Sequence, residues 1–129
     1  MNQEISAWVS KAEEDWRTMC RESLVTDGPS LNAICFHAQQ CVEKYFKARL
    51  RLEDVPFSKT HDLLILYHDV ILIEPQWSML HSGLGDLSSY AVALRYPGLD
   101  ATPDQADAAV EICNTIRSLV RRSLDLLEG

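Results

Sequence analysis

The spacing of the apolar residues constrains the fold more than any other feature of this sequence. They recur at steps of three and four along almost the whole chain, and the first such run contains Ile5, Trp8, Ala12, Trp16, Met19, Cys20 and Leu24. This spacing places side chains on one face of an α-helix, whereas a half-buried strand would alternate apolar and polar residues. No useful length of the chain alternates in that way. The pattern therefore predicts an all-α protein.

Glycine and proline residues divide this pattern into about five predicted helices. Gly28 and Pro29 end the first helix, and proline suits the first turn of the helix that follows. The third helix stops before Pro75, because the residue preceding a proline disfavours helical backbone. Gly83 and Gly85 weaken the fourth helix near its middle. The predicted helices cover roughly residues 3–25, 29–52, 61–73, 77–94 and 103–127, in a bundle without repeats.

Two polar residues are predicted to cap helices. Thr60 stands where a side-chain oxygen can cap the third helix. Thr102 begins a stronger signal, because Pro103 follows at the first helical position and Gln105 can complete a capping box. The start of the last helix is therefore the most sharply predicted boundary.

Length and cysteine usage indicate the broad class of protein. The 129 residues predict one domain over residues 1–129, long enough to bury on the order of two-thirds of the unfolded surface. Four cysteines show no Cys-x-x-Cys spacing and lie among apolar residues, so we expect them to be small buried hydrophobes. With no signal peptide and no membrane-spanning run, we expect a cytoplasmic protein that does not contact the membrane.

The net charge of −7 limits which partners the whole molecule can attract. Nucleic acid and anionic membranes would repel it, so any phosphate binding must be local. No pair of its four histidines and its carboxylates has the spacing that a bundle metal site needs. No glycine-rich phosphate loop and no serine nucleophile elbow occurs either. We therefore expect neither a metal nor a cofactor.

The second predicted helix is unusual because it is apolar on two sides. Phe36, Phe46 and Leu50 lie opposite its main apolar stripe, where a wet face would not normally carry them. Such a helix either occupies the centre of the bundle or meets a second subunit. These three residues are therefore candidates for a homodimer interface.

Polar residues of the same helix face that second apolar side. Gln40, Glu43 and Lys47 would be costly to cover unless each found a partner. Arg95 is a plausible partner for Glu43, because a guanidinium binds a carboxylate in bidentate fashion. We expect Gln40, Glu43 and Arg95 to form a structural polar network.

Three segments in order resemble one family. They are "FHAQQCVEKYFKARL" (36–50), "THDL" (60–63) and "LRYP" (94–97), before the last helix. Together they are similar to a HEPN domain (higher eukaryotes and prokaryotes nucleotide-binding), most of all to the small stand-alone prokaryotic members. The resemblance spans nearly the whole chain. It implies a four- to five-helix up-and-down bundle that pairs as a homodimer, associated with nucleotides or RNA, often beside a minimal nucleotidyltransferase in toxin–antitoxin-like pairs.

Many HEPN proteins are metal-independent ribonucleases that carry an arginine, four to six residues and then a histidine. This chain has no arginine five to seven positions before any of its histidines. The resemblance therefore favours a module without that ribonuclease site, and no catalytic residue is assigned.

The resemblance also implies which residues could meet a ligand. Lys44 and Arg95 match positions suited to phosphate contacts, Tyr96 could stack on a base, and His61 could donate a hydrogen bond. The alternative is that these residues only hold helices together. Two further functions stay open: a ribonuclease with a non-standard pair such as Arg95 with His61, and a purely structural dimerisation module.

Overall fold

The described part of the chain folds into an up-and-down bundle of five α-helices. The computed structural model describes residues 1–126, so residue 127 of the last predicted helix lies outside the described part; the helix itself ends at Ser123, earlier than predicted. No strand occurs within the described residues, which confirms the predicted all-α class. The helices are α1 (Gln3–Ser23), α2 (Leu31–Leu52), α3 (Leu63–Ile73), α4 (His81–Ser89) and α5 (Pro103–Ser123), with short 3₁₀ helices η1 (Pro75–Leu80) and η2 (Ala93–Arg95).

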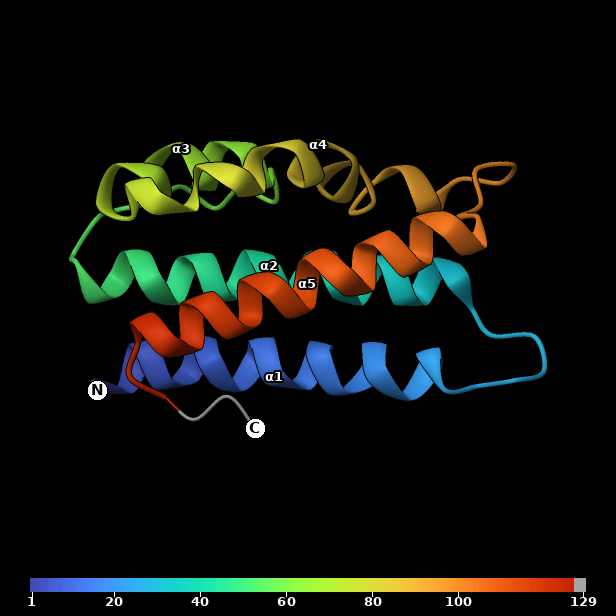
Figure 1. The fold of residues 1–129 in the computed structure, drawn as a ribbon, viewed down its shortest axis with the longest axis horizontal. Helices are drawn as coiled ribbons and strands as arrows, with labels where there is room; N and C mark the ends of the chain where they lie inside the picture. Colours follow the sequence, from blue (N-terminus) through green and yellow to red (C-terminus); the bar gives the residue numbers. More distant parts are fainter. Residues whose placement is uncertain (127–129) are drawn as a thin grey trace.

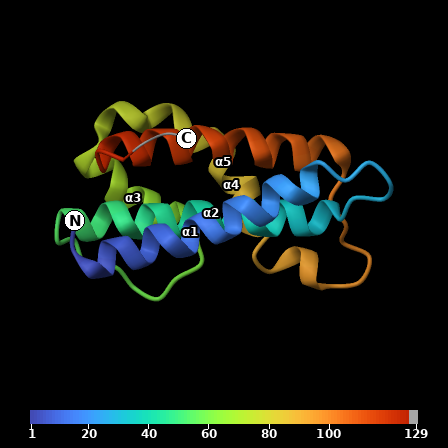
Figure 2. The same cartoon turned by 90° about the horizontal axis from the view of Figure 1, so that it is seen from below.

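Helix α2 lies at the centre of this arrangement. Figure 1 shows α2 running between α1 on one side and the α3 and α4 layer on the other, with α5 crossing in front. Seen from below in Figure 2, α1 crosses on the near side of α2, and α5 runs alongside α2, above it in the view. Helix α2 contacts α1, α5, α3 and α4, so most of its circumference is covered by its own chain.

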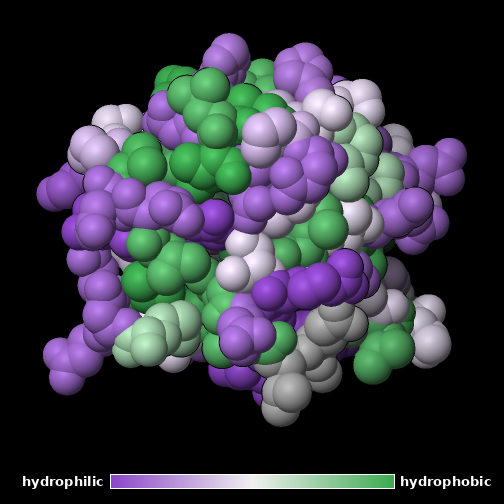
Figure 3. Space-filling view, turned by 60° about the vertical axis from the view of Figure 1, so that its left-hand side comes forward, coloured by the Kyte–Doolittle hydropathy of each residue, from purple (hydrophilic) through white to green (hydrophobic). Residues whose placement is uncertain are grey.

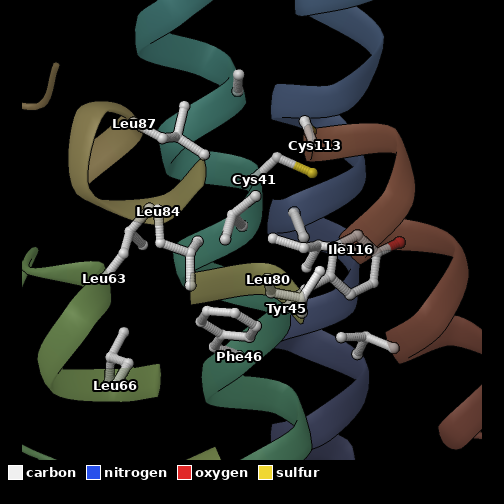
Figure 4. Packing of buried hydrophobic residues seen from close by; sticks show 14 of the residues in the cluster. Cys41, Tyr45, Phe46, Leu63, Leu66, Leu80, Leu84, Leu87, Cys113 and Ile116 are labelled. Carbon is white, nitrogen blue, oxygen red and sulfur yellow. The ribbon is translucent and has the colours of Figure 1, made fainter. Parts of the chain in front are cut away.

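The core explains why α2 is apolar on two sides. Tyr45, Phe46 and Leu50 are fully buried within the protomer. In Figure 4, Phe46 and Tyr45 project from α2 in different directions, toward the α3 and α4 side and toward α5. The placement of Phe46 and Leu50 at a dimer interface is therefore wrong. Their second apolar face packs on the chain's own α3 and α4, and Phe46 stacks at a tilt on Tyr67, with ring centroids 6.4 Å apart.

The predicted helix ends are partly right. The capping box is confirmed, because Thr102 accepts from the Gln105 amide and the Gln105 side chain accepts from the Thr102 amide. The cap of α3 is Asp62, whose side chain accepts from the Leu64 amide at 2.9 Å. Thr60 instead accepts from the Asp62 amide at 3.0 Å and shapes the turn before the cap.

The single helix predicted over residues 77–94 is broken into three pieces. Pro75 starts η1, and Trp77 has a non-helical backbone (φ −89°, ψ 20°), which kinks the chain before α4 begins at His81. Helix α4 ends at Ser89, and η2 follows within the connector to α5, residues 90–102. Buried Trp77, Leu80, Leu84 and Leu87 still face the core, so the apolar spacing was read correctly although the backbone is not one helix.

The cysteines behave as small apolar residues. Cys35, Cys41 and Cys113 are buried, and Cys20 is partly buried. Burial raises the pKa of the Cys35 thiol to about 11, so it stays protonated at neutral pH and is a poor nucleophile. Within the described residues, no helix is long and apolar enough to cross a membrane.

Candidate functional site

One strip of α2 is left open to solvent. Ala33, Phe36, His37, Gln40 and Lys44 are only partly buried, while the residues beside them on the helix are mostly buried. Their spacing of three and four puts them on one face of the helix. This strip is therefore the part of the central helix that a ligand can reach.

A cleft opens at the N-terminal end of this strip. It has a volume of about 320 Å³ and lies between the start of α2 and the segment that leaves α4. Phe36 and His37 contribute from α2, while Tyr90 and Arg95 contribute from the other side; Asn32, Ala33 and Leu94 complete the lining. The cleft is thus lined by the aromatic rings of Phe36 and Tyr90, with the side chains of His37 and Arg95 beside them.

Arg95 brings a positive charge that the fold does not neutralise. Its guanidinium lies 5.8 Å from the centre of the Phe36 ring, a cation–π distance. No carboxylate within the described part of the chain pairs with it at ion-pair distance. The side chain is exposed at the end of η2. Arg95 is therefore available for an anion.

The connector that carries Arg95 is held to the start of α2. The Asn32 side chain donates to the Asp100 carboxylate at 2.9 Å and accepts from the Ala101 amide at 2.7 Å. These two bonds span about 70 residues of sequence and fix the segment that follows Arg95. They hold the two walls of the cleft together.

His37 is oriented by a carboxylate of α1. Its Nδ1 lies 2.8 Å from Asp15 Oδ1, and because a carboxylate only accepts, Nδ1 carries the proton. The same Asp15, buried at 8% exposure, accepts from Lys44 through its other oxygen. Nε2 of His37 has no partner within the described residues and remains free to accept or donate a proton.

Tyr90 is the second aromatic residue that lines the cleft. Burial, followed by the nearby Cys35 and Asp86, raises the pKa of its hydroxyl, so the phenol stays neutral and can donate a hydrogen bond. A guanidinium binds phosphate oxygens well, and aromatic faces accept stacked bases. The arrangement is chemically suited to a nucleotide.

A second polar cluster lies further along α2, toward its C-terminal end, and is connected to the open strip through Gln40. Glu43, buried at 3% exposure, accepts from Lys47 at 3.0 Å and from the His61 ring at 2.8 Å. Gln39 donates to the His61 carbonyl at 3.0 Å and accepts from Gln40 at 2.6 Å. Arg95 is not part of this cluster, so the predicted Arg95–Glu43 pair is wrong. The charge of Glu43 is balanced instead by Lys47, whose ammonium also lies 5.2 Å from the Trp8 ring centre.

The four predicted ligand contacts do not meet in one place. Arg95 lines the cleft, and Lys44 adjoins it through Asp15. His61 points to the second cluster and to another surface hollow lined by Asp62 and Ser88. Tyr96 is 60% exposed beyond Arg95. The structure brings Arg95 beside Phe36 and His37, neither of which sequence reasoning placed at a ligand site.

Asp15 and Tyr90 were also missed. Asp15 had a detectable signal, because it interrupts the apolar stripe of α1 between Ala12 and Met19. A carboxylate on a buried stripe needs a partner, and His37 is that partner. Tyr90 had no such signal in the sequence, because it follows α4, whose end the apolar spacing did not predict. Among the described residues, no group of three histidines, cysteines or carboxylates could hold a metal ion.

Comparison with known proteins identifies the family. A family model described as HEPN domain matches residues 5–123, nearly the whole chain. Neither the curated proteins nor the solved structures gave a match. The matched range contains both walls of the cleft and the cluster around Glu43. The chain therefore belongs to the HEPN domain family.

Proposed function

We propose that this protein is a homodimeric HEPN module that binds a nucleotide or RNA in the cleft of Phe36, His37, Tyr90 and Arg95. It acts as a binding module, without the usual HEPN ribonuclease motif. The observation that carries the proposal is the Arg95 guanidinium, which is exposed beside an aromatic wall and has no carboxylate partner among residues 1–126.

The other central basic side chains support this reading by contrast. Lys44 pairs with Asp15, Lys47 with Glu43, and Arg49 with both Glu53 and Glu74. In a molecule of net charge −7, an exposed arginine without such a partner is a local site for phosphate. The cleft volume of about 320 Å³ falls within the usual range for small-ligand pockets.

Titration with AMP and with a short single-stranded RNA tests the proposal. Arg95→Ala should weaken both by about 10- to 150-fold, because a hydrogen bond to a charged group contributes about 1.5–3 kcal/mol. Arg51→Ala is the control, since it removes an arginine charge that is paired with Glu4 and lies about 22 Å from Phe36 along α2, at 1.5 Å per residue. Equal affinity of wild type and Arg95→Ala, or no binding by the wild type, would refute the site.

A second candidate function is a metal-independent ribonuclease with a non-standard site. The observation that favours it is that Arg95 and His37 line one cleft although no arginine precedes His37 at the family's spacing. His37 replaces His61 in this candidate, because His61 lies at the separate cluster with Glu43. RNA incubated with the protein in EDTA decides between the two functions. If the RNA stays intact under conditions in which a positive-control ribonuclease cuts it, the ribonuclease function is refuted and the binding module remains.

The proposal includes a homodimer, whose interface uses a different surface from the buried Phe46 and Leu50. Ile65 and Leu72 on α3 are 50% and 78% exposed, and an exposed apolar face of this kind favours an interface with a second subunit. In Figure 3, hydrophobic side chains gather at the height of the α3 and α4 layer. Phe36, under Arg95, remains a smaller candidate contact.

The dimer is tested by mass measurement at micromolar concentrations. The wild type should have twice the chain mass of 14.6 kDa, and Leu72→Lys should shift it toward monomer. Leu24→Lys is the control, because Leu24 is equally exposed at 80% but lies at the end of α1. A strictly monomeric wild type would remove the dimer from the proposal.

A nucleotidyltransferase partner in a toxin–antitoxin-like pair is the last element of the proposal, and it rests on family membership. Expression together with a minimal nucleotidyltransferase, followed by purification through a tag on this chain, tests it. A stoichiometric complex is the expected result.

A further inference from the structure

The charges around the cleft change with the protonation of His37. Asp15 and Lys44 carry opposite charges and neutralise each other, so they add nothing net. Arg95 then gives the cleft one positive charge while His37 is neutral, and two when His37 is protonated. A phosphodiester carries one negative charge, whereas a terminal phosphate carries up to two.

The contact between His37 and Asp15 decides which nitrogen of the His37 ring can meet a ligand. Nδ1 of His37 is occupied by Asp15, so Nε2 is the only ring nitrogen left to meet a phosphate oxygen. The Phe36 ring lies close to both groups, since its centre is 5.3 Å from the centre of the His37 ring and 5.8 Å from the Arg95 guanidinium. His37 and Arg95 therefore lie beside the same aromatic side chain on the wall of the cleft.

We infer that the cleft selects a terminal phosphate monoester over an internal phosphodiester, with His37 as the residue that determines this specificity. The inference rests on the proposed nucleotide-binding function. A 5′-mononucleotide or the phosphorylated end of an RNA has the required chemistry. Binding of the dianion takes up a proton on His37, and the imidazolium donates from Nε2 to the phosphate.

The other groups near His37 do not produce the same pH dependence. Arg95 stays charged at every pH of interest. Burial raises the pKa of Tyr90, so its hydroxyl does not ionise between pH 6 and 8.5. Asp100 on the connector accepts from Asn32 and does not line the cleft. Histidine is the side chain that ordinarily changes charge between about pH 5 and 8.

The test compares AMP with the dinucleotide ApA, whose single phosphate is a diester. Wild type should bind AMP about tenfold more tightly than ApA at pH 6.5, because one more charge-assisted hydrogen bond forms. That preference should shrink to about twofold at pH 8.5, where histidine is neutral. His37→Gln, which retains a donor for Asp15, should show the small preference at both pH values.

Calorimetry supplies a readout that does not depend on any variant. AMP binding to wild type at pH 7 should take up a proton, seen as a binding enthalpy that differs between buffers of different ionisation enthalpy. No proton uptake, or the same AMP preference in wild type and His37→Gln, would overturn this inference while leaving nucleotide binding intact. Failure of wild type to bind either ligand would instead refute the proposed function, and this inference with it.

Discussion

Lys47 shows what a charged residue requires inside this bundle. It is 5% exposed, pairs with Glu43 at 3.0 Å, and its ammonium lies 5.2 Å and 5.7 Å from the ring centres of Trp8 and Phe57. The ammonium is thus neutralised by one carboxylate and covered by two aromatic faces. Removing one member of such a pair lowers stability strongly, whereas replacing both members with apolar residues lowers it less.

Breaking this pair from one side should therefore destabilise the protein strongly. We expect Glu43→Gln to lower the free energy of unfolding by about 3 kcal/mol, because the buried Lys47 charge loses its counterion. The double substitution Glu43→Gln with Lys47→Met should recover most of that loss. Urea denaturation of the two single variants and the double variant measures it; additive losses would show that the two side chains are not coupled.

At the residue scale, the sequence predicted which side chains are buried better than it predicted which residues they contact. It indicated that Glu43 and Gln40 would be covered, because apolar residues lie on both sides of them; Glu43 is buried, whereas Gln40 is only partly buried. The i, i+4 spacing indicated the Glu43–Lys47 pair, but it did not identify His61, which lies 18 residues away and reaches Glu43 only through the turn before α3. The His37–Asp15 contact, 22 residues apart, depends in the same way on how α1 packs on α2.

At the element scale, regular helices were predictable and the broken segment was not. Helices α1, α2 and α5 have long uninterrupted spacing and clear ends. Residues 77–94 keep helical spacing, yet the kink at Trp77 and the stop after Ser89 depend on packing against the rest of the bundle. Spacing also cannot tell whether a second apolar face, such as that of Phe46, meets the same chain or another.

The two glycines of α4 differ in the space around them. A Cβ on Gly83 would lie 3.1 Å from Ile112 Cδ1, whereas a Cβ on Gly85 would meet nothing within 4 Å. We expect Gly85→Ala to stabilise the protein by about 0.5–1 kcal/mol, the difference in helix propensity. Gly83→Ala should lose most of that gain to the contact with α5. Thermal unfolding of the two variants compares them directly, and equal stabilisation would contradict the close packing of α4 on α5.

At the scale of the whole molecule, Glu13 connects three helices. It receives both 2.8 Å bonds of a bidentate Arg117 from α5, and the Tyr45 hydroxyl of α2 donates to it as well. Burial alone would raise the pKa of Glu13, but the hydrogen bonds from Arg117 and Tyr45 and the charges of Arg117 and Arg121 outweigh it and lower the pKa. The pKa of Glu74 is lowered too, because bonds from Ser123 and Arg49 outweigh its burial.

These lowered pKa values predict loss of stability in acid. A carboxylate with a depressed pKa stabilises the fold above its ordinary value of 4.5, and that contribution is lost as the pH falls through the folded pKa. Glu13→Gln should lower the free energy of unfolding by about 2 kcal/mol at pH 7 and by much less near pH 3. Urea denaturation from pH 3 to 7 measures this. Glu14→Gln, at an exposed neighbour, should follow wild type throughout.

The central position of α2 also determines how the binding cleft moves. Backbone amides of a helix covered by four neighbours exchange with solvent only when the whole protein unfolds, whereas exposed short segments open locally. The α2 wall with Phe36 and His37 should therefore be the slowest part of the chain to exchange deuterium, and the wall with Arg95 one of the fastest. A ligand that bridges the two walls would slow exchange on the Arg95 side alone, so the connector would report occupancy while α2 serves as the fixed reference.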